Sequence, residues 1–337
     1  MNTIKVNLGE NSYNVYVGGG LINEAKNLFN LGRKVLVVTD DGVPPEYAKQ
    51  IAEQCKEAYI VTVPQGEGSK SIETLSLLLS EMLNNGFNRN DCAVAVGGGV
   101  VGDLAGFTAS CYMRGIDFYN IPTTFLSQVD SSIGGKTAID FMGLKNIVGA
   151  FYPPKAVIID PETLKTLSQR QISNGLAESV KMSLTSDKSL FELFENENIE
   201  DNYDKIIESS LLIKKAVVEA DEKEQGLRRI LNFGHTLAHA IETANSMQNY
   251  YHGECVAMGM LPMCSSDVRA RLVRVLKKLN LPTALEQSDK ATLINACRHD
   301  KKLQGNDITV VLVNKVGEYE LKKMPFEEFE KIISEAL

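Results

Sequence analysis

The chain has 337 residues, of which 44% are hydrophobic and 23% charged, and its formal net charge at pH 7 is −8. At ~150 residues per domain, this length favours two globular domains with a large buried core. The acidic balance argues against a general nucleic-acid binder. No apolar run approaches the ~18 residues of a membrane-spanning helix. The polar start does not resemble a signal peptide, so we expect a cytoplasmic protein that binds neither membrane nor nucleic acid.

The cysteines are scattered along the chain and form no CxxC pair: Cys55, Cys92, Cys111, Cys255, Cys264 and Cys297. Such spacing favours free thiols in a reducing compartment over a disulfide framework or a cysteine-ligated zinc site. We therefore expect the hydrophobic core, rather than disulfides or metal, to stabilise the fold.

Strand and helix patterns alternate through the first half of the chain. Short β-branched or apolar runs predict strands at 34–40, 59–64, 92–98, 117–124 and 156–160. Between them, helical apolar spacing predicts a helix at 44–58, after a proline pair, and another at 71–86, which ends at a glycine. This alternation predicts a mainly parallel sheet with helices on both faces.

Helical spacing dominates the second half. It predicts a long helix at 203–224, and the one exception is a hairpin predicted at 307–321, turning near Gly317. We therefore expect an α/β nucleotide-binding domain over residues 1–165 and a mainly α-helical metal- and substrate-binding domain over residues 166–337.

Two glycine-containing segments follow predicted strands. "AVGGGVVGD" at 95–103 lets the backbone approach a ligand, and the N-terminus of a following helix can hold phosphate oxygens. The segment matches neither GxGxxG nor a P-loop, so a nucleotide pyrophosphate and a tight strand–helix connection remain the alternatives. "QGEGSK" at 65–70 lies where open α/β sheets bind ligands, although an ordinary loop has the same composition.

The segment at 129–149, "VDSSIGGKTAIDFMGLKNIVG", combines glycines with Asp130, Lys136, Lys145 and Asn146. Lysines beside flexible backbone suit a phosphate or a carboxylate. The alternative is a solvated charged loop, because lysine is usually exposed.

Three of the four histidines of the chain lie within 18 positions. "GHTLAHAIE" predicts a helix with His235 and His239 on one face, and His252 follows beside Glu254. Histidines with a carboxylate are typical of a catalytic zinc site, but the motif is not HExxH, and spacing leaves open which histidines bind metal. The alternative is a set of buried histidines that form hydrogen bonds in a helical core.

Cationic residues accompany the histidines. Lys181 lies one turn after Glu178, Lys214 lies on the long predicted helix, and Arg228 lies one turn before Asn232. Each alone is typical of an exposed helix surface. Together, around a candidate metal, they indicate a polyanionic substrate.

Six segments, in order, resemble the successive signatures of the 3-dehydroquinate synthase family of sugar phosphate cyclases: "GGGVVGDLAGFTAS", "RGIDFYNIPTTFLSQVDSSIGGKTAID", "KNIVGAFYPP", "GLAESVK", "NFGHTLAHAIE" and "HGECVAMGM". The "DKK" at 300–302 extends the resemblance towards the end of the chain. The resemblance implies a homodimeric NAD- and metal-dependent phosphate lyase of the shikimate pathway. Its substrate would be 3-deoxy-D-arabino-heptulosonate 7-phosphate, converted to 3-dehydroquinate and phosphate by transient oxidation, elimination, re-reduction and aldol cyclisation.

The resemblance also implies roles for individual residues. The ligands of zinc or cobalt would be Glu178, His235 and His252. NAD would contact Glu67, Lys70, Gly97, Gly98, Gly99, Val100, Val101, Gly102, Asp103, Thr123, Thr124, Lys136 and Lys145. The substrate would contact Arg114, Lys145, Asn146, Lys214, Arg228, Asn232 and Lys302, and the catalytic groups would be Asp130, Lys136, Lys181, Glu224 and His239. Arg114 would reach the phosphate of the neighbouring subunit, so that the homodimer completes the active site.

The sequence departs from the family pattern in two places. Gly68 and Ser69 stand where the family has a bulkier pair, which predicts altered cofactor affinity. The stretch at 261–280 is shorter than in the family, which predicts a lost helix–helix connection.

Three rival functions remain open. A related cyclase that makes an inosose or valiolone shares the fold, but it would not bind a carboxylate, for which Lys214 and Arg228 are suited. A metal-dependent polyol dehydrogenase would release NADH and would not need so many cations. A binding module without catalysis would have no need of the full set of proposed ligands.

Overall fold

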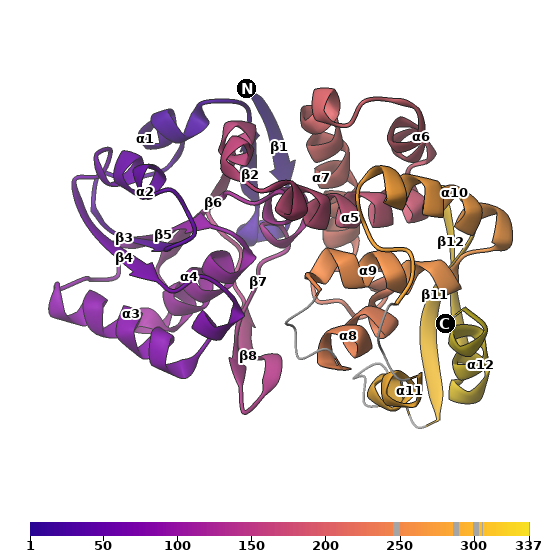
Figure 1. The fold of residues 1–337 in the computed structure, drawn as a ribbon. Helices are drawn as coiled ribbons and strands as arrows, with labels where there is room; N and C mark the ends of the chain where they lie inside the picture. Colours follow the sequence, from indigo (N-terminus) through magenta and orange to yellow (C-terminus); the bar gives the residue numbers. More distant parts are fainter. Residues whose placement is uncertain (245–249, 286–289, 299–302, 305, 337) are drawn as a thin grey trace. The chain divides into compact units, whose positions relative to one another are not determined.

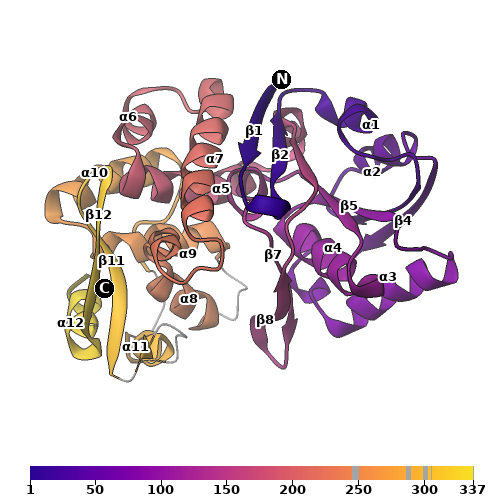
Figure 2. The ribbon, with the colours of Figure 1, turned by 180° about the vertical axis from the view of Figure 1, so that it is seen from behind.

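The computed structural model describes residues 1–244, 250–285, 290–298, 303–304 and 306–336. The chain divides into two compact units, Met1–Leu167 and Ser168–Leu337 (Figure 1 and, from behind, Figure 2). Every helix within the described ranges is too short or too polar to span a lipid bilayer.

The first unit is built on a seven-stranded sheet in the order β1-β2-β9-β6-β5-β3-β4. Its strands are β1 (Asn2–Val6), β2 (Tyr13–Val17), β3 (Lys34–Asp40), β4 (Glu57–Val63), β5 (Cys92–Gly97), β6 (Asp117–Pro122) and β9 (Ala156–Ile159). Neighbouring strands pair in parallel, except β1 and β2, which form an antiparallel hairpin at one edge. The mainly parallel sheet is confirmed, whereas the edge hairpin was not predicted.

Helices cover both faces of this sheet, as predicted (Figure 1). They are α1 (Ala25–Leu28), α2 (Pro45–Ala52), α3 (Ile72–Asn84) and α4 (Gly99–Cys111). Leu36 and Val38 of β3 pack in one core cluster with residues of α3 and α4. Val35 and Val37 point the other way and pack with α1 and α2. Because β3 is buried on both faces, its sequence is an almost continuous apolar run.

The helix predicted at 44–58 was too long. It ends at Ala52, because Glu57 already pairs with Lys34 of β3 and begins β4. By contrast, α3 begins one residue after the predicted start, and the side chain of Ser71 accepts the backbone N–H of Thr74 as an N-terminal cap.

A two-stranded hairpin, β7 (Lys136–Phe141) and β8 (Leu144–Phe151), occupies most of the segment at 129–149. Its turn residues, Met142 and Gly143, both have positive φ, of 49° and 77°. Two left-handed residues are the requirement of a tight hairpin turn whose twist matches that of the strands. The alternative of a solvated charged loop was therefore wrong as to the loop, although Lys136 and much of β8 are exposed.

The second unit is mainly helical, as predicted. Its helices are α5 (Gln169–Ser186), α6 (Lys188–Asn196), α7 (Tyr203–Ala220), α8 (His235–Ala244), α9 (His252–Met260), α10 (Ser266–Lys278), α11 (Lys290–Arg298) and α12 (Phe326–Ala336). A small antiparallel sheet contains β10 (Leu303–Gln304), β11 (Asp307–Lys315) and β12 (Glu318–Pro325). The predicted hairpin and its turn at Gly317 are confirmed, and α7 ends four residues earlier than predicted.

Helix α5 is buried over most of its length. All residues from Ile172 to Thr185 are buried, including Glu178 and Lys181. The helix packs against α6, α7 and α9. A helix buried on all sides is normally apolar, so its charged residues indicate a functional site.

Candidate functional site

Glu178, His235 and His252 come together in the second unit. Each offers one ligand atom, and these atoms lie within 4.8 Å of one another. Oε1 of Glu178 lies 3.3 Å from Nε2 of His252 and 3.7 Å from Nε2 of His235. Tetrahedral zinc holds such ligands at ~2.1 Å, which places neighbouring ligand atoms about 3.4 Å apart. The two Glu178–histidine separations match this spacing, so the three side chains fit a small divalent metal once the remaining separation, at most 4.8 Å, shortens.

Glycines allow the helices that carry these side chains to approach closely. His235 is the first residue of α8, and Gly234 before it has a φ of +75°. A Cβ at Gly234 would lie 2.8 Å from the backbone nitrogen of Met260. A Cβ at Gly253, next to His252, would lie only 1.9 Å from the carbonyl oxygen of Asn174. Any side chain at either position would force α8 or α9 away from its neighbour and separate the three ligands.

The second ring nitrogen of each histidine has a hydrogen-bond partner. Nδ1 of His235 lies 3.1 Å from the carbonyl oxygen of Phe233, and Nδ1 of His252 lies 2.6 Å from Oε1 of Glu242. When Nδ1–H donates in this way, Nε2 carries the lone pair that a metal needs. Sequence reasoning did not single out Glu242. Its position two helical turns after His235, on the same face, was the signal that could have found it.

The carboxylates around His252 favour a bound cation. Glu178 and Lys181, 1% and 2% exposed, form an ion pair within α5. Burial by itself lowers the pKa of His252, but hydrogen bonds to Glu178 and Glu242 and the charges of both carboxylates outweigh it and raise the pKa to about 10. A bound metal ion would take the place of the proton that these carboxylates stabilise.

Lys214 lies on the face of α7 that packs against α5. Ser210, one turn earlier on α7, donates a 2.9 Å hydrogen bond to Ser179 of α5, and both serines are buried. Lys214 is also buried. The structure thus places this predicted substrate residue against the helix that carries Lys181.

The segment before α8 brings further predicted residues together. The side-chain amide of Asn232 donates a 2.7 Å hydrogen bond to Glu224. Arg228 is buried, and its guanidinium donates to the carbonyl of Glu222 at 2.6 Å. Backbone N–H groups hold the carboxylate of Asp221 and lower its pKa, although burial opposes this shift. These contacts order the 3-10 helix Leu227–Asn232, which leads into His235.

Of two further predicted residues, the structure describes His239 but not Lys302. His239 is exposed on α8, and its ring centroid lies 5.5 Å from that of His235. It is therefore beside the candidate metal ligands without belonging to the group of three. Lys302 lies outside the described residues.

The first unit holds a second charged cluster, around Lys70. This ammonium group is 4% exposed and lies 2.8 Å from Asp103 and 3.5 Å from Glu67. It also donates a hydrogen bond to the side-chain amide oxygen of Asn146 on β8. Burial opposes the charged form, but Asp103 and Glu67 outweigh it and raise the pKa of Lys70. The cluster joins the 65–70 loop, α4 and the β7–β8 hairpin.

Part of the glycine pattern at 95–103 serves packing within the chain. A Cβ at Gly98 would lie 3.1 Å from the side chain of Thr124, and one at Gly99 would lie 3.0 Å from that of Ser131. Val101 is fully buried, so only its backbone is available to a ligand at the start of α4. The Thr124 hydroxyl lies 2.8 Å from that of Ser127, while Thr123 is buried.

The remaining predicted residues lie around α4 and the hairpin. Gly102, Asp103 and Lys136 line a cavity of about 10 Å³. Asp130 lies in the π-helical turn Ser127–Ser131 just before this hairpin. Val100, Asp130 and Lys145 are half-buried. Arg114 is exposed and has a φ of +69°.

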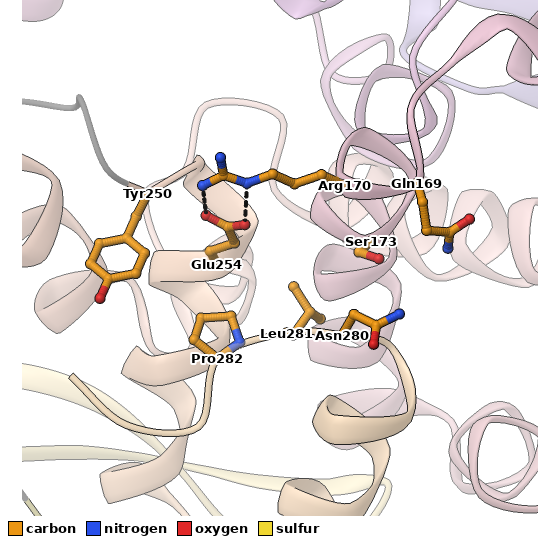
Figure 3. Close-up of a pocket in the computed structure, with 8 residues that line it drawn as sticks. All are labelled: Gln169, Arg170, Ser173, Tyr250, Glu254, Asn280, Leu281 and Pro282. Atoms are coloured by element: carbon orange, nitrogen blue, oxygen red, sulfur yellow. Dashed lines mark hydrogen bonds and ion pairs between the residues drawn. The ribbon is translucent and has the colours of Figure 1, made fainter. Parts of the chain in front are cut away.

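A pocket of about 570 Å³ lies in the second unit, beside the first turn of α9 (Figure 3). It is lined by Gln169, Arg170, Ser173, Tyr250, Glu254, Asn280, Leu281 and Pro282. Two of these lining residues, Arg170 and Glu254, are joined directly by hydrogen bonds of 2.7 and 2.8 Å (Figure 3). Apart from Glu254, which pairs with Arg170, none of the predicted site residues lines this pocket, so we locate the candidate active site at the histidine–carboxylate centre, where the ligand atoms converge.

The fold and the site together define the class of sugar phosphate cyclases. The chain resembles 2-deoxy-scyllo-inosose synthase complexed with carbaglucose-6-phosphate, NAD+ and Co2+, with a TM-score of 0.89 and 25% identity over 100% of both chains. It also resembles ValA, the 2-epi-5-epi-valiolone synthase of Streptomyces hygroscopicus subsp. jinggangensis 5008 with NAD+ and Zn2+ bound, with a TM-score of 0.87 and 26% identity over 98% of both chains. A probable glycerol dehydrogenase from Sinorhizobium meliloti 1021 shares the fold alone, with a TM-score of 0.63 and 16% identity over 96% of this chain and 95% of that one.

Within this class, the chain belongs to the 3-dehydroquinate synthase family. The family model of the 3-dehydroquinate synthase N-terminal region matches residues 60–174, and that of the C-terminal region matches residues 175–303. The 3-dehydroquinate synthase of Clostridium beijerinckii (strain ATCC 51743 / NCIMB 8052) is 41% identical over 98% of this chain and 100% of that protein. The one from Campylobacter curvus (strain 525.92) is 41% identical over 95% of each. The family predicted from the signatures is confirmed.

The Clostridium alignment also bears on chain length. It runs over 351 positions, more than the 337 residues of this chain, so that relative contains residues that this chain lacks. Residues 261–280 fold as a 3-10 turn, Leu261–Met263, followed closely by α10. That the missing residues belong at this connection stays a prediction.

Proposed function

We propose that the chain is a 3-dehydroquinate synthase, an NAD- and metal-dependent lyase that converts 3-deoxy-D-arabino-heptulosonate 7-phosphate to 3-dehydroquinate and phosphate. The full-length similarity to proteins of that name supports this. The observation that carries the proposal is the convergence of Glu178, His235 and His252, because their atoms form a metal-binding group beside buried cations.

We assign the metal to Glu178, His235 and His252, and NAD to the start of α4 with the Lys70 cluster. When bound, a divalent metal acts as a Lewis acid on substrate hydroxyls, and NAD supplies a reversible redox couple that leaves the overall reaction redox-neutral. Backbone N–H groups at the start of α4 suit phosphate oxygens. The buried side chain of Val101 keeps that helix start packed against the sheet.

The cations of the second unit suit the two anionic groups of the substrate. Lys181, Lys214 and Arg228 are buried, and each presents a positive charge in surroundings of low dielectric constant. Their roles are to hold the carboxylate and phosphate in one orientation, so that oxidation, elimination, reduction and cyclisation proceed without release of substrate. Asn232, ordered by Glu224, adds a polar group three residues before His235.

Proton transfer falls to side chains that are near the metal ligands but are not ligands themselves. His239 is exposed and lies one turn beyond His235 on the same face of α8. Histidine titrates near neutral pH, which suits it to accept or donate a proton at a reacting carbon or oxygen. In the first unit, Asp130, Lys136 and Lys145 complete the set of substrate- and cofactor-contacting groups that we propose, with Thr123 and Thr124 on the nucleotide.

We further propose a cytoplasmic homodimer in which Arg114 reaches the phosphate bound by the neighbouring subunit. The exposure of Arg114 supports this role. For the metal, zinc and cobalt are both proposed, because the two similar cyclases carry Zn2+ and Co2+, respectively.

One assay tests the function. Purified protein is incubated with NAD, Zn2+ or Co2+ and the heptulosonate phosphate, and inorganic phosphate and NADH absorbance are followed together. Phosphate release without net NADH supports the synthase, and net NADH would indicate a dehydrogenase instead. Glucose 6-phosphate, the parent of the carbaglucose-6-phosphate in the similar cyclase, is the matched alternative substrate. Turnover of that sugar alone would replace our proposal by the related cyclase reaction.

A further inference from the structure

The two histidines of the candidate metal centre are held in different ways. Nδ1 of His235 faces a neutral partner, the backbone carbonyl of Phe233, at 3.1 Å. Nδ1 of His252 faces the carboxylate of Glu242 at 2.6 Å. A hydrogen bond from an imidazole to a carboxylate is shorter and roughly twice as strong as one to a neutral acceptor.

Glu242 reaches His252 from another helix. It lies on α8, two turns after His235 and on the same face, and it is buried. Helix α8 therefore supplies a proposed metal ligand, His235, as its first residue. It also supplies Glu242, the partner of the second histidine ligand, as its eighth.

The backbone around His252 is fixed independently of Glu242. Asn174 of α5 accepts the backbone N–H of Gly253 at 2.6 Å. Arg170, one turn earlier on α5, pairs with Glu254 through two hydrogen bonds of 2.7 and 2.8 Å. Because the start of α9 is held by α5, rotation of the imidazole ring is the freedom that remains at His252.

Two features make ring orientation at His252 more demanding than at His235. The His252 side chain is 34% exposed, against 11% for His235, so packing restrains it less. His252 is also the first residue of α9, where the positive end of the helix dipole disfavours a cation. A carboxylate partner both restrains the ring and offsets this dipole.

We propose that Glu242 is a positioning residue that holds Nδ1–H of His252 and aims Nε2 at the metal beside Glu178. The inference rests on the proposed metal centre. Carboxylate partners of this kind fix the tautomer of a ligating histidine and increase its basicity, and their loss typically weakens metal binding ~10–100-fold.

The test measures metal affinity directly, by competition with a chromophoric chelator for Zn2+, in the full-length chain. Glu242→Gln keeps the size of the side chain and removes its charge, so we expect the Kd for Zn2+ to rise ~10–100-fold. Co2+ in place of Zn2+ gives a visible spectrum that reports ligand geometry, and we expect its bands to shift in Glu242→Gln. Glu195→Gln is the matched control, because Glu195 is an ion-paired carboxylate of the same unit that pairs with Arg271 and with none of the histidines in the described ranges.

The outcomes separate the inference from the function on which it rests. Weaker metal binding in Glu242→Gln, with normal binding in Glu195→Gln, supports the role of Glu242. Wild-type affinity in Glu242→Gln, while His235→Ala binds no metal, overturns this role and leaves the metal centre intact. Tight binding in His235→Ala overturns the centre itself. An equal loss in both glutamine variants would show a general effect of stability and would also overturn the role.

A second variant, Glu242→Asp, tests the role of Glu242 if Glu242→Gln does not fold. If Glu242→Gln is not recovered as a folded protein by circular dichroism, Glu242→Asp keeps the charge and withdraws it from His252 by one methylene. It is expected to weaken Zn2+ binding measurably relative to the wild type. Unchanged affinity there would contradict the positioning role.

Discussion

Each unit of the chain buries a cluster of charged side chains, and the two clusters differ in how their charge is balanced. In the first unit, the ammonium of Lys70 lies among Asp103, Glu67 and the amide oxygen of Asn146, so a cation already occupies the centre. In the second unit, two carboxylates face the ring of His252 and raise its pKa to about 10.

The two clusters therefore differ in what balances their carboxylates, an ammonium group of the chain in one unit and a proton on histidine in the other. A buried cation with carboxylate partners inside its own unit holds three elements together, here a loop, α4 and the β7–β8 hairpin. Carboxylates that stabilise a proton on histidine instead form a site in which a metal cation can replace that proton. The same residue types thus join three elements in the first unit, where we also propose NAD contacts, and surround the proposed metal centre in the second.

The largest expected effect is that of removing a metal ligand. In His235→Ala, we expect loss of bound metal and of phosphate release, because only Glu178 and His252 would remain of the three converging ligands. Metal content is measured by elemental analysis of the purified variant, and turnover by phosphate release. An active variant without metal would contradict the centre.

A smaller effect is expected at the neighbouring histidine. His239→Ala should retain its metal, because His239 lies outside the converging group, while turnover falls ~10²–10⁴-fold through loss of proton transfer. The same two measurements apply to both variants. Loss of metal in His239→Ala would show that the two histidines of this helix act as an equivalent pair.

The two histidines show which parts of the site could be predicted from the sequence and which could not. Helical spacing placed Lys181 one turn after Glu178, and the structure pairs the two side chains, because residues one turn apart on a helix are neighbours. Spacing alone paired His235 with His239, and the resemblance to a family selected His252 as the second histidine ligand. The structure brings His252 to His235 through the packing of α8 against α9, which no local pattern encodes.

The fold was likewise predicted well where the evidence is local in the sequence, and poorly where residues far apart in the chain meet. Strand β3 was predicted to the residue, and the neighbouring strands to within two residues at each end, because burial on both faces leaves a continuous apolar run. The β7–β8 hairpin was missed because glycines and lysines obscure its alternation. The Lys70 cluster was not foreseen as a connection, since Lys70 and Asn146 are 76 residues apart and meet only in the folded chain.

An intermediate effect is expected at the Lys70 cluster. Lys70→Met leaves the carboxylate of Asp103 without its 2.8 Å ammonium partner, and we expect a loss of about 2–3 kcal/mol in the free energy of unfolding, lessened because Asp103 is partly exposed. Urea denaturation measures this loss, and the KM for NAD should also rise. Zn2+ affinity should stay at the wild-type value, and a loss there would show that the two clusters are not independent.

The smallest effect is expected at a peripheral ion pair. The guanidinium of Arg271 forms hydrogen bonds of 2.6 and 2.8 Å to Glu195 and lies 5.2 Å from the ring centroid of Phe191. Hydrogen bonds to Arg271 lower the pKa of Glu195, although its partial burial opposes this. Because both side chains are partly exposed, we expect Arg271→Gln to lower the free energy of unfolding by only about 0.5–1 kcal/mol at pH 7.

The pH dependence of that loss identifies its cause. A carboxyl group whose pKa is lower in the folded state contributes stability above its unfolded pKa of ~4.3, and this contribution disappears as the pH falls through the folded pKa. The stability difference between wild type and Arg271→Gln should therefore be constant from pH 7 to about 5 and shrink towards pH 3 in urea titrations. A difference that persists unchanged at pH 3 would assign the loss to packing of Arg271 on Phe191, and not to its charge.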